Sequence, residues 1–280
     1  MFKEFGMGAL EEYHSKERTE RLFTEAISVA RIEARKLIET RFENPAEEKD
    51  RLDFHNWPHT DSIMHRTGRI LLAIKQVGPS LVNERDIGLG YFTSAFHDTV
   101  QKWKQEEKQD GDFTIIKRTR FVTQNEEKSA DEAEDLMDKI NAREKQGIFT
   151  EEDKKKIREG IMATVPGFVP EKGVIQPNLN EQSGIIARAV ALADLGGAGM
   201  EGPKTFFKEG NDLFREENMD IAEALKKPEW LLEKQKDFIR NRMMGWSRFQ
   251  VVFATSRKNR FEEELLGLPE EAREVVRGLF

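Results

Sequence analysis

The sequence contains no cysteine. Disulfide bonds, thiolate catalysis and cysteine-ligated zinc are therefore excluded, so any metal ion must be held by histidine, aspartate or glutamate. No apolar run approaches the ~18 residues that are needed to span a bilayer. Residues 1–10 also lack the basic and apolar regions of a signal peptide. We therefore expect a soluble cytoplasmic protein without a membrane partner.

Basic residues are outnumbered by acidic ones, with 45 Lys and Arg against 52 Asp and Glu and a net charge of -7. An acidic balance argues against a nucleic-acid partner, because binding to phosphate backbones depends on a surplus of Lys and Arg. A small anionic substrate remains compatible with it, since a metal ion and a few local cations reverse the sign of the charge inside a cleft.

Most of the chain has the periodicity of amphipathic helices, and period-two alternation is scarce. Three places carry the signals of a helix start. Pro58 is well placed in a first turn behind Asn56 or Trp57. Asn83 could cap a second helix, and Thr150 opens a third with an aspartate in the capping-box position. Without internal repeats or a linker, the 280 residues predict one all-α domain over 1–280, with its core at about 50–260. Helices are expected at 9–42, 57–77, 83–97, around 130–140, from 150 through 161, and at 181–195, 203–218 and 228–261.

Two segments differ from the other predicted helices and turns. Residues 101–124 are polar and charged apart from a strand-like stretch at 113–116, so we expect a long loop or small lid beside a functional site. The long helix 228–261 carries an apolar stripe that includes Trp246 and Phe253. That stripe fits either a core position or the interface of a homo-oligomer, and core is the favoured interpretation.

Four of the five histidines lie between residues 55 and 97. His55 and His59 are about one helical turn apart, so both rings can point to one side. His97 and Asp98 together offer a neutral nitrogen and an anionic oxygen to one cation. Each of these pairs taken alone is a weak signal, because capping or core histidines also occur at such spacing.

Asp194 lies in the almost entirely apolar stretch 185–195. A carboxylate in such a helix is costly to bury unless it is paired or bound to a metal ion. Asp194 therefore either forms an ion pair with an arginine such as Arg188 or Arg242, or completes a metal site.

In this order, the histidines, the His-Asp pair and the distant aspartate resemble the HD superfamily of metal-dependent phosphohydrolases. The leading motif from His55 to His59 also resembles the His-Asn-x-x-His signature of cyclic-nucleotide phosphodiesterases. The runs Asn-Glu-Glu-Lys-Ser-Ala at 125–130 and Ala-Asp-Leu-Gly at 193–196 are similar to a bacterial group of predicted HD phosphohydrolases. The resemblance covers about residues 50–260 and implies an HD-type helical bundle.

The resemblance implies that His59, His97, Asp98 and Asp194 bind a divalent ion such as Mn, Mg, Zn or Fe. Because no histidine follows His97, we expect one tightly held ion, with any second ion bound weakly through carboxylates and water.

The resemblance further implies that His55 protonates the leaving oxygen. Glu126 or Glu127 would lie near the attacking water as an acceptor or general base. The alternative for this glutamate pair is the ordinary acidic first turn of a helix capped by Asn125.

The expected reaction is hydrolysis of a small phosphorylated substrate, a nucleotide or a cyclic-nucleotide-like molecule, by metal-activated water. Lys102, Lys104, Arg188 and Arg242 are candidates for binding its phosphate, although each is also explained as a solvated or structural charge. The alternatives are a di-iron HD-type oxygenase, which generally needs more histidines, and a non-catalytic nucleotide-binding HD module, against which the intact ligand set argues. The Glu-Asp pair that follows His-Asp in alarmone hydrolases is absent here, which leaves the substrate class open.

Overall fold

The structure, a computed structural model, describes residues 7–170 and 173–280, with side chains from residue 17 onward. Most of the described chain is helical, which confirms the helical character of the prediction. The long helices are α1 (Met7–Ile38), α2 (Trp57–Val77), α3 (Glu84–Phe96), α4 (Gln124–Glu144), α5 (Glu151–Met162), α6 (Ile185–Asp194), α8 (Gly202–Glu217) and α10 (Glu233–Leu265). The short ones are α7 (Gly197–Met200), α9 (Met219–Ala224) and α11 (Glu270–Arg277), with a π turn at Glu39–Glu43 and 3-10 turns at Glu48–Asp50 and Pro228–Trp230.

Two small antiparallel sheets accompany the helices, so the fold is mostly but not entirely α-helical. One consists of β1 (Trp103–Asp110) and β2 (Phe113–Arg120), and the other of β3 (Gly167–Val169) and β4 (Gly173–Ile175).

The capping signals of the sequence mark the starts of three helices that position the site. Helix α2 begins at Trp57 with Pro58 in its first turn, as predicted, and the side chain of Asn56 caps it. Asn83 caps α3 and Thr150 caps α5, each in a capping box with the aspartate three residues later. These helix starts are therefore confirmed, and they fix where the chain enters each helix.

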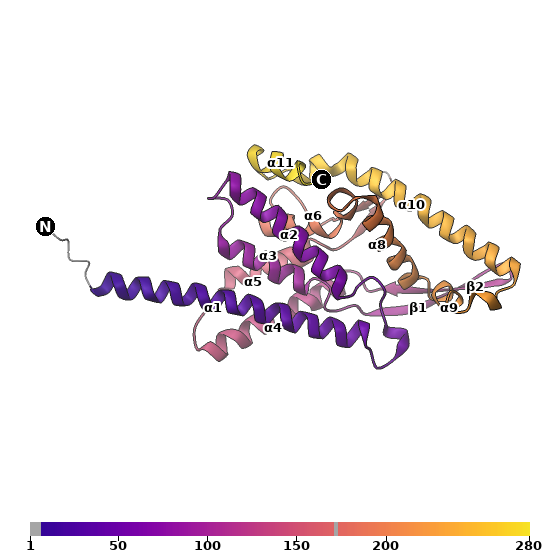
Figure 1. Ribbon diagram of the computed structural model, residues 1–280, viewed down its shortest axis with the longest axis horizontal. Coiled ribbons are helices and arrows are strands. Elements are labelled where there is room, and N and C mark those ends of the chain that lie inside the picture. Colours follow the sequence, from indigo (N-terminus) through magenta and orange to yellow (C-terminus); the bar gives the residue numbers. More distant parts are fainter. Residues whose placement is uncertain (1–6, 171–172) are drawn as a thin grey trace.

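Helix α6 lies at the centre of the helical body, in contact with α2, α3 and α5. Its residues from Ile186 to Ala193 are all buried, which explains its apolar composition. One apolar cluster joins α1, α3, α4 and α5, and includes Phe92 and Met137. A second cluster joins α2 and α6 to α11 and includes Ile63 and Leu192. In Figure 1, α1 runs along one edge of the molecule and α10 along the opposite edge.

Residues 101–124 contain a regular β-hairpin, so the prediction of a long loop is wrong, although the strand-like stretch at 113–116 does lie in β2. The alternative of a lid stays a prediction. Strand β1 pairs with β2 from Trp103 opposite Arg120 to Asp110 opposite Phe113, around a turn in which Gly111 has φ +61°. A two-residue Gly-Asp turn at residues 111–112, followed by β-branched residues, is typical of such a hairpin, because its first position requires positive φ.

Asn125 has a different role from the predicted helix cap. Helix α4 begins at Gln124, and Thr123 occupies the N-cap position without a side-chain cap hydrogen bond. The Asn125 side chain instead accepts from the backbone N–H of Lys102 at 2.9 Å and donates to its carbonyl at 3.0 Å. It therefore fastens the base of the hairpin to α4.

The long C-terminal helix begins at Glu233, after the 3-10 turn, and continues past the predicted end to Leu265. Its aromatic stripe packs on α8. The rings of Phe253 and Phe206 stack with centroids 5.8 Å apart, and those of Trp246 and Phe214 with centroids 5.4 Å apart. Trp246 and Phe253 therefore pack against α8 within the same chain, and both rings remain partly exposed.

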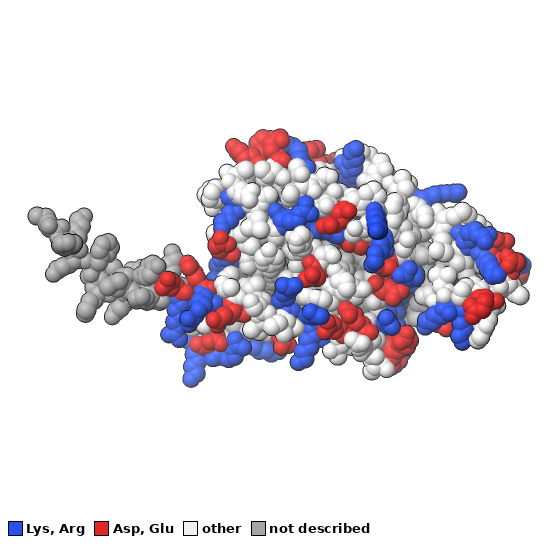
Figure 2. Space-filling model, in the orientation of Figure 1, with Lys and Arg blue, Asp and Glu red and all other residues white. Residues whose placement is uncertain are grey.

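Acidic and basic side chains are intermingled over the face of the molecule shown in Figure 2. Many of them pair along a helix or between neighbouring helices, as Arg35 does with Glu39 at 2.7 Å and Arg41 with Glu132 at 2.8 Å. Within the described ranges, no helix combines the length and the apolar character needed to cross a membrane.

Candidate metal centre

Three helix ends bring the predicted metal ligands together. His59 lies in the first turn of α2, His97 follows the last residue of α3 and precedes Asp98, and Asp194 ends α6. The C-terminal ends of α3 and α6 carry the negative ends of their helix dipoles, which favours a cation between them. Residues far apart in sequence meet here because α6 packs against both α2 and α3.

His59, His97 and Asp98 form a buried group whose donor atoms lie within 4.8 Å of one another, so this group could hold a metal ion. Oδ2 of Asp98 is 3.0 Å from Nε2 of His97 and 3.6 Å from Nε2 of His59. Oδ1 of Asp194 is 3.9 and 3.7 Å from the same two nitrogens. Atoms bound at about 2.1 Å around one tetrahedral ion lie about 3.4 Å apart. The separations within the group of His59, His97 and Asp98 therefore fit one shared ion, and Asp194 lies beside this group.

The histidine nitrogens in this group are left without other partners. Both ring nitrogens of His59 and Nε2 of His97 are buried and have no hydrogen-bond partner. His97 donates its Nδ1–H to the carbonyl of Ser94 at 2.7 Å, which turns Nε2 toward the site. Orphaned imidazole nitrogens beside two carboxylates are a donor set suited to zinc, manganese or iron. The residues present thus fit a divalent metal ion.

The protonation of the group depends on the close packing of its charges. Burial lowers the pKa of His97, but the interactions with Asp98, Asp194 and the Ser94 carbonyl together outweigh burial and raise this pKa to about 9. Burial raises the pKa of Asp98, yet the charges of His97 and His55 hold that pKa well below its usual range. Burial raises the pKa of Asp194. Without a metal ion the site therefore carries protons that metal binding would displace.

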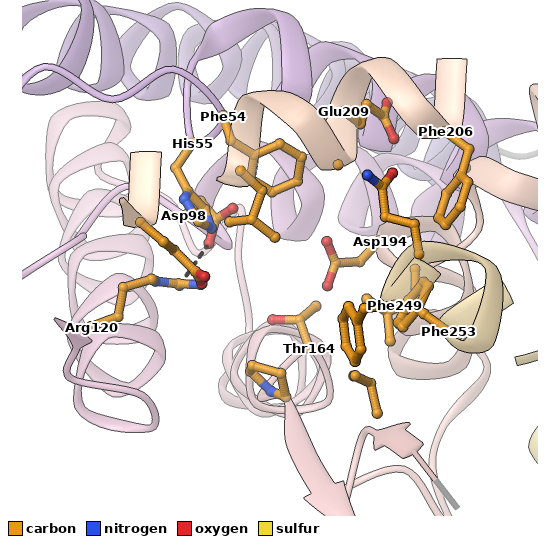
Figure 3. Close-up of a pocket in the computed structure, with 18 of the residues that line it drawn as sticks. Phe54, His55, Asp98, Arg120, Thr164, Asp194, Phe206, Glu209, Phe249 and Phe253 are labelled. Carbon is orange, nitrogen blue, oxygen red and sulfur yellow. Dashed lines mark ion pairs between the residues drawn. The ribbon is translucent and has the colours of Figure 1, made fainter. Parts of the chain in front are cut away.

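The second carboxylate oxygen of Asp98 faces nitrogen donors. Its Oδ1 accepts a hydrogen bond from Nε2 of Gln101 at 2.7 Å. Nη2 of Arg120 lies 3.8 Å from the same oxygen and 3.5 Å from Oε1 of Glu126 (Figure 3). Because Arg120 ends β2, the hairpin brings a fixed positive charge to the site.

His55 is held in place by Glu216 of α8. Nδ1 of His55 contacts Oε1 of Glu216, while Oε2 accepts the backbone N–H groups of Phe54 at 2.8 Å and His55 at 3.0 Å. Burial raises the pKa of Glu216, but the charge of His55 and these hydrogen bonds outweigh burial and lower the pKa to about 2. The carboxylate fixes the orientation of the ring and leaves Nε2 of His55 free of this contact.

The two glutamates at the start of α4 point in different directions. Glu126 is buried, lines the same cavity as Asp98, and has an Oε2 atom without a partner. Burial raises the pKa of Glu126, and the charge of Arg120 offsets part of this effect. Glu127 is exposed, as expected for an ordinary residue of an acidic first turn. Glu126 is therefore the member of the pair that lies at the site.

The four cations predicted to bind phosphate do not line the cavity. Arg188 is buried, and its guanidinium donates to backbone carbonyl groups. Arg242 pairs with Asp220. Lys102 and Lys104 are exposed on the hairpin. The interpretation as structural or solvated charges therefore describes all four, and the structure gives no support to a substrate contact for them.

Asp194 does not pair with either arginine that the sequence offered as an alternative. Its Oδ1 atom faces His59 and His97. Arg188 and Arg242 have the other partners described above. The arrangement around Asp194 thus favours the metal-site alternative over the ion pair.

A cavity of about 360 Å³ opens from this group toward α8 and α10. In Figure 3, His55, Asp98 and Arg120 lie at one end of it, Phe206, Phe249 and Phe253 lie at the other end, and Asp194 is between them. The cavity thus has a polar end that carries the charged groups and an aromatic end formed by two helices. Its size is in the range of pockets that bind small molecules.

Arg120 and Glu216 are two charged site residues that sequence reasoning missed. Arg120 belongs to a segment assigned to a loop, where a single arginine carries no signal. Recognising the Gly-Asp turn at residues 111–112 would have paired it with Trp103 at the base of a hairpin. Glu216 lies in an acidic pair at the end of α8, and only the tertiary contact with His55 distinguishes it from Glu217.

Comparisons with known proteins leave the family unassigned. No protein-family model matches the chain, and no significant match occurs among curated proteins or solved structures. The resemblance to the HD superfamily therefore stays a prediction that rests on the motifs.

Proposed function

We propose that this chain is a metal-dependent phosphohydrolase whose single divalent ion is held by His59, His97, Asp98 and Asp194. The observation that carries the proposal is the pair of buried histidines whose Nε2 atoms have no hydrogen-bond partner and face two carboxylates. An arginine lines the cavity beside them. A cation site next to a fixed positive charge suits a phosphoester better than a neutral substrate.

The ion would activate a water molecule and neutralise charge on the phosphoryl oxygens. Arg120 would bind a phosphoryl oxygen through its guanidinium. His55 would donate a proton from Nε2 to the leaving oxygen, while Glu216 holds the ring in place. Glu126, with its free Oε2, would accept a hydrogen bond from the attacking water and so orient it.

Arg120 also supports one ion over two. Two-metal sites place their ions about 3.5–4 Å apart, usually across a bridging carboxylate. The Oδ1 atom of Asp98, which would face a second ion, already has Gln101 at 2.7 Å and the Arg120 guanidinium at 3.8 Å. A second cation would meet electrostatic repulsion from this arginine. The same repulsion counts against the di-iron alternative.

Turnover of phosphoesters by the metal-loaded protein tests the proposal. We expect hydrolysis of at least one member of a panel of nucleotides, cyclic nucleotides and a chromogenic bis-phosphoester in the presence of Mn, Mg or Zn. Asp98→Ala and Glu126→Gln should abolish or strongly reduce that rate. His65→Ala, at an exposed position of α2, is the matched control and should keep it. Equal rates in Asp98→Ala and in the control would overturn the proposal.

A further inference from the structure

The aromatic end of the cavity indicates what the substrate carries besides its phosphate. We infer that the preferred substrate is a phosphoester with one phosphoryl group and an uncharged, ring-bearing or similarly apolar organic group. This inference rests on the proposed function, since the phosphoryl group is assigned to the end of the cavity that holds Asp98 and Arg120. The organic group would then lie against α8 and α10.

The wall at the aromatic end is built from side chains that are partly exposed within the cavity. Phe249 and Phe253 are one helical turn apart on α10, and Phe206 comes from α8. Phe206 and Phe253 are nearly parallel, with an interplanar angle of 8°. None of these three rings is fully buried, so a bound apolar group would remove further aromatic surface from water.

The charges that line the cavity limit the number of phosphates. Within the described chain, Arg120 is the only Lys or Arg of the lining, whereas Glu126 and Glu217 add to the two aspartates of the metal group. Glu209 also lines the cavity, but Arg66 pairs with it at 2.6 Å. A second or third phosphoryl group would extend from the ion toward these carboxylates without a cation to receive it. Nucleoside triphosphates and other polyphosphates are therefore poor substrates on this account.

A matched series of esters separates the organic group from the chemistry. The probes are 2-(1-naphthyl)ethyl phosphate, ethyl phosphate and 2-(1-naphthyl)ethyl diphosphate. In all three, the ester oxygen is attached to a primary alkyl carbon. With the Mn-loaded protein we expect kcat/KM for the naphthyl phosphate to exceed that for ethyl phosphate by roughly 10- to 100-fold. The diphosphate should be a poorer substrate than the monophosphate.

Variants on α10 test whether the aromatic wall causes the preference. Phe249→Ala should lower the ratio of the naphthyl to the ethyl kcat/KM by about tenfold, and Phe249→Leu should restore part of it. Val252→Ala is the control, because Val252 lies on the same helix with 62% of its surface exposed. This control should leave the ratio unchanged, and circular dichroism checks that all variants remain folded.

Binding of 2-(1-naphthyl)ethylphosphonate, measured by calorimetry against ethylphosphonate, tests the ligand class separately from the hydrolytic function. If neither ester is hydrolysed but the naphthyl phosphonate binds preferentially and Phe249→Ala removes the preference, the ligand class stands and the hydrolytic function fails. If both esters are hydrolysed at equal kcat/KM, or if the diphosphate is preferred, the substrate inference is overturned while the hydrolytic function stands.

Discussion

His59 presents two ring nitrogens to the protein interior, and neither has a hydrogen-bond partner. A buried polar atom without a partner costs about 1–3 kcal/mol, so a purely structural residue at this position would be a poor choice. Metal coordination by Nε2 would explain why this cost is tolerated. Residues that bind a metal ion commonly reduce the stability of the metal-free protein.

Replacement of His59 therefore separates a structural from a functional role. We expect His59→Leu to lose metal binding and turnover while the free energy of unfolding of the metal-free protein is unchanged or higher, as measured with urea. Ile63→Ala, a buried position on the same helix, should instead lose about 2–5 kcal/mol. A loss in His59→Leu as large as that in Ile63→Ala would contradict the functional assignment.

The pairing of His55 with Glu216 predicts a dependence on the leaving group. His55→Ala and Glu216→Gln should slow alkyl phosphoesters by about 100-fold, because a poor leaving group needs the proton. Both variants should slow a p-nitrophenyl ester much less. Rates on the two esters measured side by side provide the test, and equal losses would remove the acid role of His55.

Glu216 also predicts a pH effect on stability. Its folded-state pKa of about 2 lies below the ordinary value of 4.5 because His55 and the backbone stabilise the carboxylate. Its contribution is therefore present above pH 4.5 and is lost as the pH falls from 4.5 toward 2. Urea unfolding at pH 3 and pH 6 should show a smaller pH-dependent loss in Glu216→Gln than in the wild type. An identical loss in the two proteins would contradict this assignment.

At the scale of elements, the hairpin matters because it holds Arg120. Phe113 at its tip stacks on Phe238 of α10 with ring centroids 4.2 Å apart, which fixes the far end of the hairpin. We expect Phe113→Ala to increase amide hydrogen exchange in 103–120 and to lower kcat/KM by a smaller factor than Arg120→Ala. Thr114→Ala, an exposed neighbour on β2, is the control. Unchanged exchange in Phe113→Ala would show that this stack does not order the hairpin.

Most helices could be predicted from the sequence because their signals are local. Asn56, Asn83 and Thr150 cap helices through residues three positions away, and such contacts are readable in one dimension. The hairpin was not predicted because β1 is polar along its exposed length and shows no apolar alternation. The metal group was found through residue types, whereas Arg120 and Glu216 depend on contacts between distant elements.

At the scale of the whole molecule, the site lies where the helical body meets the layer formed by α8 and α10. Asp98 and Asp194 come from the body, while Glu216 and the aromatic wall come from the outer layer. A ligand that bridges the two parts should stabilise the native chain as a unit. Phosphate or a substrate analogue would add to the effect of metal.

Metal binding should therefore raise the melting temperature. A ligand present at 100 times its Kd stabilises a protein by about 2.7 kcal/mol, which corresponds to roughly 5–10 °C for a chain of this size. Calorimetry of the wild type with and without Mn or Zn should show such a shift, and Asp98→Ala should show none. A shift of equal size in Asp98→Ala would place the ion elsewhere.

The most direct test of the central claim is the metal content of the purified protein, determined by inductively coupled plasma mass spectrometry after loading with Mn, Zn, Fe or Mg and dialysis. We expect one equivalent of a divalent ion per chain, lost in both His97→Ala and Asp194→Ala and retained in the His65→Ala control. A wild-type chain that stays metal-free after loading with each of these ions, or variants that retain a full equivalent, would contradict this claim.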